Sequence, residues 1–206
     1  GTNGVVGAGF TVDASGVSVT AGVGTFTSYQ GSAASLTQIP AANIVGVATA
    51  GFGNGILQVV QTFKSDTTSF TSNSQTTFSD ISGMSVSITP SNSSNKILVF
   101  FTANVSCSSQ NRNNTIRLLR DSTVVGAGTA GSTVNGSIID RTKDDDILDP
   151  KSNMFLDSPS TTSAITYKLQ WTCEGSGGNQ TYYLNRRATS TGQSSASHIT
   201  VMEVAA

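Results

Sequence analysis

Residues 97–107 read Ile-Leu-Val-Phe-Phe-Thr-Ala-Asn-Val-Ser-Cys and place an apolar side chain at every second position. Successive side chains of a β-strand point to opposite faces, so this period of two predicts a long strand with one face in a core. Residues 165–173, Ile-Thr-Tyr-Lys-Leu-Gln-Trp-Thr-Cys, repeat the pattern. Both runs end in a cysteine. We therefore expect Cys107 and Cys173 to face one core, either as two buried thiols or as a disulfide.

Shorter runs with the same period surround these two strands, and helical periodicity is absent almost everywhere. They are residues 57–63, 84–88, 116–118, 124–125, 182–184 and 199–204. About eight to ten strands separated by turn signals predict an all-β fold, a β-sandwich. The long strands and long connections favour a jelly roll, with a core around Val99, Phe101, Leu169 and Trp171. We expect the apolar C-terminal run to be tied into a sheet.

The first part of the chain has a different composition. Asp13 is its single charged residue before Lys64, and twelve of the 21 glycines lie within residues 1–56. Its apolar pieces are too short to bury a face within one chain, because ordering each residue costs roughly 1–2 kcal/mol of backbone entropy. We therefore predict a Gly-rich shaft or collar over residues 1–56, shared by three identical chains, and a jelly-roll head over residues 57–206. The alternative for residues 1–56 is a flexible Gly/Ser linker.

The charge and the hydrophobic pattern argue against two classes of partner, nucleic acids and membranes. The net charge is −1 and no basic block occurs, which argues against a nucleic-acid-binding groove. No apolar run approaches the roughly 18 residues of a membrane span, so we expect no membrane insertion. Because Gly1 is not an initiator methionine, we expect the chain to be a processed or excerpted piece of a longer polypeptide.

Residues that could support catalysis are few. The chain has one histidine, His198, and no Gly-x-Ser-x-Gly or His-Glu-x-x-His motif. The densest carboxylate group is Asp140, Asp144, Asp145, Asp146 and Asp149. It is open to three interpretations: a solvated loop, a Ca²⁺ loop or a glycosidase pair. We favour the solvated loop and predict a protein with no catalytic residues, no metal and no cofactor.

Three polar clusters are suited to binding a glycan or a protein surface. Aromatic faces stack on sugar rings, and amides and guanidinium groups form hydrogen bonds with hydroxyl and acidic groups. The alternative for each cluster is an ordinary solvated turn, and one of the two tyrosines is expected in the core. The candidate receptor-binding residues are Asn111, Arg112, Asn113, Asn114, Arg141, Lys143, Tyr182, Tyr183, Arg186 and Arg187.

A resemblance covers most of the chain from Gly31 onward. Residues 31–47, Gly-Ser-Ala-Ala-Ser-Leu-Thr-Gln-Ile-Pro-Ala-Ala-Asn-Ile-Val-Gly-Val, are similar to a stretch in fibre proteins of marine tailed bacteriophages, including cyanophages. Residues 57–66, Leu-Gln-Val-Val-Gln-Thr-Phe-Lys-Ser-Asp, resemble the opening of their terminal domain. Shorter similarities follow in the same order, among them residues 86–90, 117–123, 156–159 and 199–204. The resemblance implies a virion fibre with a trimeric jelly-roll head. It does not imply any catalytic residues in this chain. It does not distinguish a tail fibre from a capsid fibre.

The sequence thus predicts a non-enzymatic phage virion fibre, assembled in the host cytoplasm, whose head attaches to a host-surface glycan or protein. Its expected partners are two further copies of itself and other virion proteins. The first alternative is a virion structural component, such as a head fibre, decoration or tail-junction protein, whose head binds other virion proteins. A glycan-cleaving tailspike and a secreted ligand of the tumour-necrosis-factor type are further alternatives.

Overall fold

The structure is a computed structural model, and it describes residues 10–13, 16–19, 55–131, 134–144, 147–174 and 178–206. The chain divides into two compact units, Gly1–Val47 and Ala48–Ala206. In the first unit β1 (Phe10–Asp13) pairs with β2 (Gly16–Val19) as an antiparallel hairpin. Most of the predicted shaft lies outside the described residues, so the trimeric shaft and its boundary at residue 56 stay predictions.

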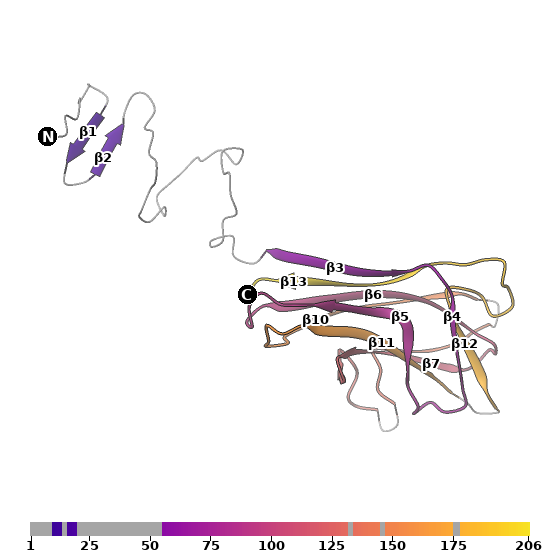
Figure 1. The fold of residues 1–206 in the computed structure, drawn as a ribbon. Helices are drawn as coiled ribbons and strands as arrows, with labels where there is room; N and C mark the ends of the chain where they lie inside the picture. Colours follow the sequence, from indigo (N-terminus) through magenta and orange to yellow (C-terminus); the bar gives the residue numbers. More distant parts are fainter. Residues whose placement is uncertain (1–9, 14–15, 20–54, 132–133, 145–146, 175–177) are drawn as a thin grey trace. The chain divides into compact units, whose positions relative to one another are not determined.

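The second unit is the head, and all of its described secondary structure is β-strand (Figure 1). Its strands are β3 (Ile56–Lys64), β4 (Thr68–Ser72), β5 (Ser79–Ile88), β6 (Lys96–Cys107), β7 (Asn113–Arg120), β8 (Thr123–Val125), β9 (Ile138–Arg141), β10 (Asp149–Asp157), β11 (Ile165–Cys173), β12 (Gln180–Leu184) and β13 (Ser197–Val204). The described residues contain no helix long and apolar enough to cross a membrane.

The strand pairing is nested along the chain. β3 pairs with β13, β4 with β12, β5 with β11 and β6 with β10, and β7 pairs with β8 and β9. One long antiparallel hairpin is thus rolled into two sheets. The first has the order β3-β13-β6-β12-β4, with β10 also paired to β6, and the second has the order β5-β11-β7-β8, with β9 also paired to β7. This is a jelly-roll β-sandwich, as the sequence predicted.

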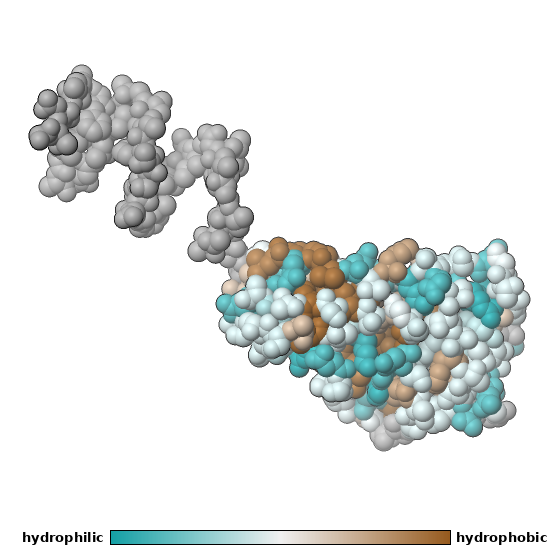
Figure 2. Space-filling model, viewed as in Figure 1, coloured by the Kyte–Doolittle hydropathy of each residue, from teal (hydrophilic) through white to brown (hydrophobic). Residues whose placement is uncertain are grey.

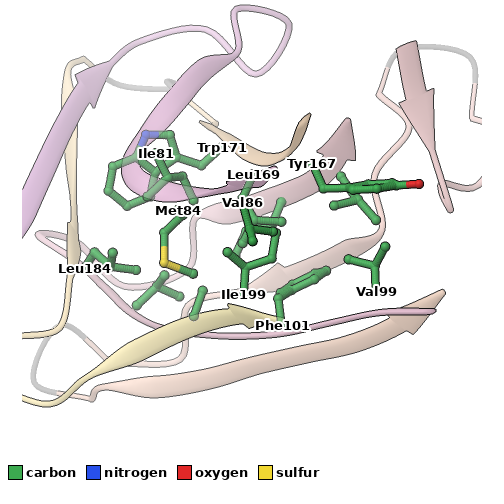
Figure 3. Close-up of a cluster of buried hydrophobic side chains, with 14 of the residues drawn as sticks. Ile81, Met84, Val86, Val99, Phe101, Tyr167, Leu169, Trp171, Leu184 and Ile199 are labelled. Carbon is green, nitrogen blue, oxygen red and sulfur yellow. The ribbon is translucent and has the colours of Figure 1, made fainter. Parts of the chain in front are cut away.

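The core lies between the two sheets, where every second residue along most of β6 and β11 is buried (Figure 3). Val99 and Phe101 of β6 and Ile199 of β13 come from one sheet. Leu169 and Trp171 of β11 come from the other. The residues that the sequence placed in the core are buried there. Cys107 and Cys173 are also buried, and both are free thiols.

Sequence periodicity did not identify three strands: β4, β9 and β10. In β10, Met154, Phe155 and Leu156 are consecutive apolar residues, so the run has no period of two. Phe155 packs against the core, whereas Met154 and Leu156 point outward and are 63% and 47% exposed. Pro150 fits because β10 pairs only with β6, and an edge strand tolerates a residue without an N–H.

The C-terminal strand occupies the middle of its sheet. β13 pairs with β3 on one side and with β6 on the other, which confirms that the C-terminal run is tied into the fold. Its Glu203 is fully buried and accepts hydrogen bonds from Gln58 Nε2 (2.6 Å), the Ser91 N–H and Oγ (both 2.7 Å) and Asn95 Nδ2 (2.6 Å). This carboxylate joins β13, the start of β3 and the turn between β5 and β6.

A buried asparagine holds the junction between β12 and β13. Asn185 Nδ2 donates to the carbonyls of Lys64 and Asp66, each at 2.9 Å, and its Oδ1 accepts from Ser197 Oγ at 2.5 Å. Its φ is +66°, a left-handed conformation that asparagine adopts more readily than most residues. Asn185 thus fixes the place where β3 gives way to β4 and β12 gives way to β13.

Candidate functional site

Two of the predicted polar clusters lie at the same end of the head. β6 runs from Lys96 to Cys107, and residues 108–112 follow at its far end. β10 starts opposite Val105, so the connection that precedes it lies at this end too. The N–H of Ala205 donates to the Gly55 carbonyl at the opposite end, where β6 begins. We call the described residues 108–112 and 141–144 the tip loops; they lie at the end of the head remote from Gly55 (Figure 1).

Backbone hydrogen bonds hold the tip loops together. The Asn111 N–H donates to the Thr142 carbonyl (2.6 Å), and the Thr142 N–H donates to the Arg112 carbonyl (2.8 Å). Arg141 Nε donates to the Asn111 carbonyl at 3.2 Å, and Asn113 pairs with Arg141 in the β7–β9 ladder. Asn111 has a φ of +61° and is exposed, as are Arg141 and Lys143. The structure therefore brings the candidate residues around Asn111 and those around Arg141 into one polar surface.

Beside the tip loops, Lys151 lies between two carboxylates of the Asp140–Asp149 group. Its Nζ forms ion pairs with Asp140 and, at 3.4 Å, with Asp149. Burial acts to raise the pKa of Asp140, but the hydrogen bonds from Lys151 and from the Arg141 backbone, together with the positive charges of Lys151 and Lys143, outweigh it and lower the pKa. Within the described residues no group of three or more His, Cys, Asp or Glu side chains is arranged to hold a metal ion. A lysine ammonium is thus the cation that these two carboxylates bind.

Two of the candidate receptor-binding residues are buried, and their assignment to an exposed cluster is wrong. Tyr182 is 1% exposed and its hydroxyl donates to the Asn113 carbonyl at 3.0 Å. Asn114 is 5% exposed and pairs with Asp140. Neither side chain reaches the surface. Alternation with Leu184, which is also buried, was a signal in the sequence that Tyr182 faces inward.

The remaining members of the tyrosine and arginine cluster, Tyr183, Arg186 and Arg187, lie on β12 and just after it. Tyr183 pairs with Ser106 of β6, and the Arg186 guanidinium lies over the Tyr183 ring, 3.8 Å from its centroid. The Ser106 hydroxyl donates to the Arg186 carbonyl, and Arg187 Nη2 donates to Gln193 Oε1. Such a cation–π pair offers a flat, partly charged surface to a ligand. The strand that carries Tyr183 is joined to the tip loops, because the Ser108 N–H donates to the Thr181 carbonyl (2.9 Å) and the Thr181 N–H donates to Ser108 Oγ (3.0 Å).

A cavity of about 660 Å³, which no sequence pattern indicated, lies on the sheet that contains β7 and β8. It is lined by residues that include Phe78, Arg117, Val124, Gly126 and Asn135. Arg117 is held by two hydrogen bonds to Gln170 Oε1, and its guanidinium lies 3.6 Å from the centroid of the Phe78 ring. The cavity therefore combines a fixed guanidinium with a mixed lining, in which Phe78 and Val124 are apolar and Thr76 and Asn135 are polar. Arg117 alternates with buried Ile116 and Leu118, which was the only signal that it faces outward.

Comparisons with known proteins give only a weak structural similarity. No protein-family model and no curated protein matches the chain. The head is similar to the crystal structure of the infectious bursal disease virus VP2 subviral particle, with a TM-score of 0.38 and 15% identity over 71% of this chain and 39% of that one. It is also similar to infectious bursal disease virus Gx strain, with a TM-score of 0.37 and 13% identity over 71% and 40% of the two chains. The chain thus spans about two fifths of the length of these structures, and the similarity is too weak to assign a function.

Proposed function

We propose that this chain is a non-enzymatic virion fibre protein of a tailed phage whose head attaches to the host surface through its tip loops. The observation that supports this function most directly is the position of those loops. Asn111, Arg112 and Arg141 lie at the end of the head remote from Gly55, which is where the N-terminal segment joins. A distal polar surface is what an adhesive head presents first to a cell.

The chemistry of the tip loops suits a glycan or another surface rich in hydroxyl and carboxylate groups. Arg141 and Lys143 are exposed and positively charged, and Asn111 adds an amide with both donor and acceptor atoms. A guanidinium binds carboxylate oxygens with two parallel hydrogen bonds, which gives direction as well as attraction. The backbone bonds around Thr142 fix the loops before binding, so little conformational entropy is lost.

The sequence resemblance supports the other parts of the proposal. Residues 1–56 form a shaft shared by three chains, the homotrimer is fixed in the virion through its N-terminal part, and the protein needs no cofactor. The alternative is a virion structural component whose head binds other virion proteins. In that case the tip loops lie against a neighbouring protein and are inaccessible in the virion.

Immunogold electron microscopy tests this function on intact virions. Antibodies raised against a peptide of residues 105–116 report whether the tip loops are accessible and where they lie. The proposal predicts label at the free ends of fibres and a loss of host adsorption when Fab fragments are bound. Label confined to a tail junction or absent from intact virions, together with unchanged adsorption, overturns attachment and supports the structural alternative.

A further inference from the structure

The outer face of the sheet that contains β3, β13, β6 and β10 carries rows of apolar side chains. The register aligns Val59, Met202, Leu98 and Leu156 in one row across the four strands. The next row is Gln61, Thr200, Phe100 and Met154, and the third is Phe63, His198, Thr102 and Ser152. Residues two apart on a strand share a face, so these three rows form one surface, the apolar face.

Large side chains of the apolar face are in contact with water in the single chain. Phe63 is 64% exposed, Met154 63%, Val59 56%, Leu156 47% and Phe100 37%. A shift in register between Glu203 and Val204 leaves Ile56 and Leu57 exposed as well at the start of β3. Figure 2 shows hydrophobic residues gathered at this end of the head. The inward apolar residues of β6 and β13, among them Val99, Phe101 and Ile199, are fully buried, whereas Val60 of β3 and Phe155 of β10 are partly buried.

The exposed area approaches the size of a protein–protein contact. Seven side chains, five of the apolar face together with Ile56 and Leu57, are on average about half exposed. Only two of them are aromatic, so we take about 150 Å² for each free side chain, the lower end of the aromatic range, which leaves roughly 550 Å² of apolar surface in water. The largest apolar patch on a typical monomer is about 300–600 Å². A stable interface buries about 800 Å² on each partner. The apolar face therefore supplies most of the area that one such interface needs.

The other sheet of the head shows what a solvated face of this protein is like. Its outward residues include Lys168, which forms an ion pair with Asp80 at 2.8 Å, and Arg117, which is held by Gln170. None of the twelve positions in the three rows of the apolar face is an acidic or basic residue apart from His198, whose ring lies 5.4 Å from that of Phe100. Of these two faces, only that of the sheet with β5 and β11 carries the charged pairs that are typical of a surface in contact with water.

We infer that the apolar face packs against other copies of this chain, with Phe100 and Met154 at the centre of the contact. An uncharged face cannot select a different protein through complementary charge, whereas three copies of one apolar face can cover one another around a three-fold axis through one repeated, heterologous contact. This inference rests on the homotrimer of the proposed function and locates its contact within the head. It assigns the head a role in assembly as well as in attachment.

Thiol labelling of the full chain tests the contact, because both native cysteines are buried and a single introduced cysteine becomes the reactive one. The test variant is Met154→Cys and the matched control is Ile139→Cys, at a residue of β9 that is 56% exposed on the other sheet. We expect a maleimide to label the test variant at least about tenfold more slowly than the control in the native protein, and at the same rate in urea. Light scattering on the same samples gives the number of chains.

A second substitution separates docking from any other cause of protection. Val59→Glu places a charge on the apolar face at a residue that is 56% exposed, so the head folds, as Trp171 fluorescence reports. It should restore fast labelling of Met154→Cys, whereas Ile139→Glu should not. Equal labelling of the two single variants, protection that survives Val59→Glu, or protection in a protein with the mass of one chain each overturns the inference. The antibody experiment is independent of these results, because tip loops at a fibre end remain compatible with a contact elsewhere.

Discussion

Replacing Glu203 with glutamine tests the electrostatics of the head. The carboxylate is fully buried and accepts four hydrogen bonds, three of them at Oε1. Burial acts to raise the pKa of Glu203, but the hydrogen bonds from Asn95, Gln58 and Ser91 outweigh it and lower the pKa from 4.5 to about 2. A neutral glutamine of the same shape removes the charge that these donors stabilise, and it turns an amide donor toward one of them.

The size of the effect follows from the two pKa values. A carboxyl group with a pKa near 2 in the folded state and 4.5 when unfolded contributes about 3 kcal/mol to the free energy of unfolding once it is ionised. Because the folded pKa is the lower one, this contribution is fully present above about pH 4.5 and is lost as the pH falls toward 2. Glu203→Gln should therefore cost about 3 kcal/mol at pH 7, and less than about 1 kcal/mol near pH 2.

Urea unfolding at pH 7, 5 and 3, followed by the fluorescence of the single tryptophan, Trp171, measures this difference at a constant protein concentration. Asp80→Asn is the control, because Asp80 is an exposed carboxylate whose ion pair with Lys168 contributes about 0–1 kcal/mol. A loss for Glu203→Gln below about 1 kcal/mol at pH 7, or one that stays the same at every pH, refutes the reasoning.

Three further predictions concern the junction, a glycine and the tip loops. Asn185→Ala should lower the free energy of unfolding by about 2–4 kcal/mol in urea titrations, because it leaves the buried Lys64 carbonyl and the partly buried Asp66 carbonyl without this donor at a residue of positive φ. Asn111→Ala, with a similar φ but at the surface, should cost less than about 1 kcal/mol, and equal losses would contradict the role of the Asn185 side chain. Gly126→Ala should lower the melting temperature, because its Cβ would lie 2.8 Å from an aromatic carbon at a φ of +58°, whereas Gly128→Ala, with nothing within 4 Å, should change it little. Arg141→Ala should leave stability within about 0.5 kcal/mol of wild type but weaken the binding of purified protein to host cells, and unchanged binding would argue against this residue as a receptor contact.

The alternation of apolar and polar residues predicted the strands whose two faces differ in polarity. It did not identify strands whose two faces are alike. β6 and β11 alternate apolar and mostly polar residues, and their predicted bounds agree with the structure to within one residue. β10 has the core on one side and the apolar face on the other, so no alternation was visible. β4 has Phe70 as its single large apolar residue, and only the packing of that ring against Trp171, with centroids 6.0 Å apart, reveals its role.

The candidate site was predicted in part for a similar reason. Local turn signals located Asn111 and Arg112 between two strands, and the structure confirms that connection. The approach of Arg141 to Asn111 depends on the pairing of β7 with β9, which no local pattern indicated. The apolar face was also beyond local reasoning. Its rows combine residues that are about 140 positions apart in the chain, such as Val59 and Met202.

The central position of β13 has a consequence for synthesis on the ribosome. Every strand that β13 contacts is translated before it, and the two halves of its sheet, β3 on one side and β6 on the other, have no direct pairing with each other. Until residues 197–204 leave the exit tunnel, β3 therefore has no partner in the sheet, and the donors around Glu203 have no acceptor. A polypeptide released before β13 lacks the strand that joins β3 to β6, so translation through β13 acts as a check on chain length before this sheet can close.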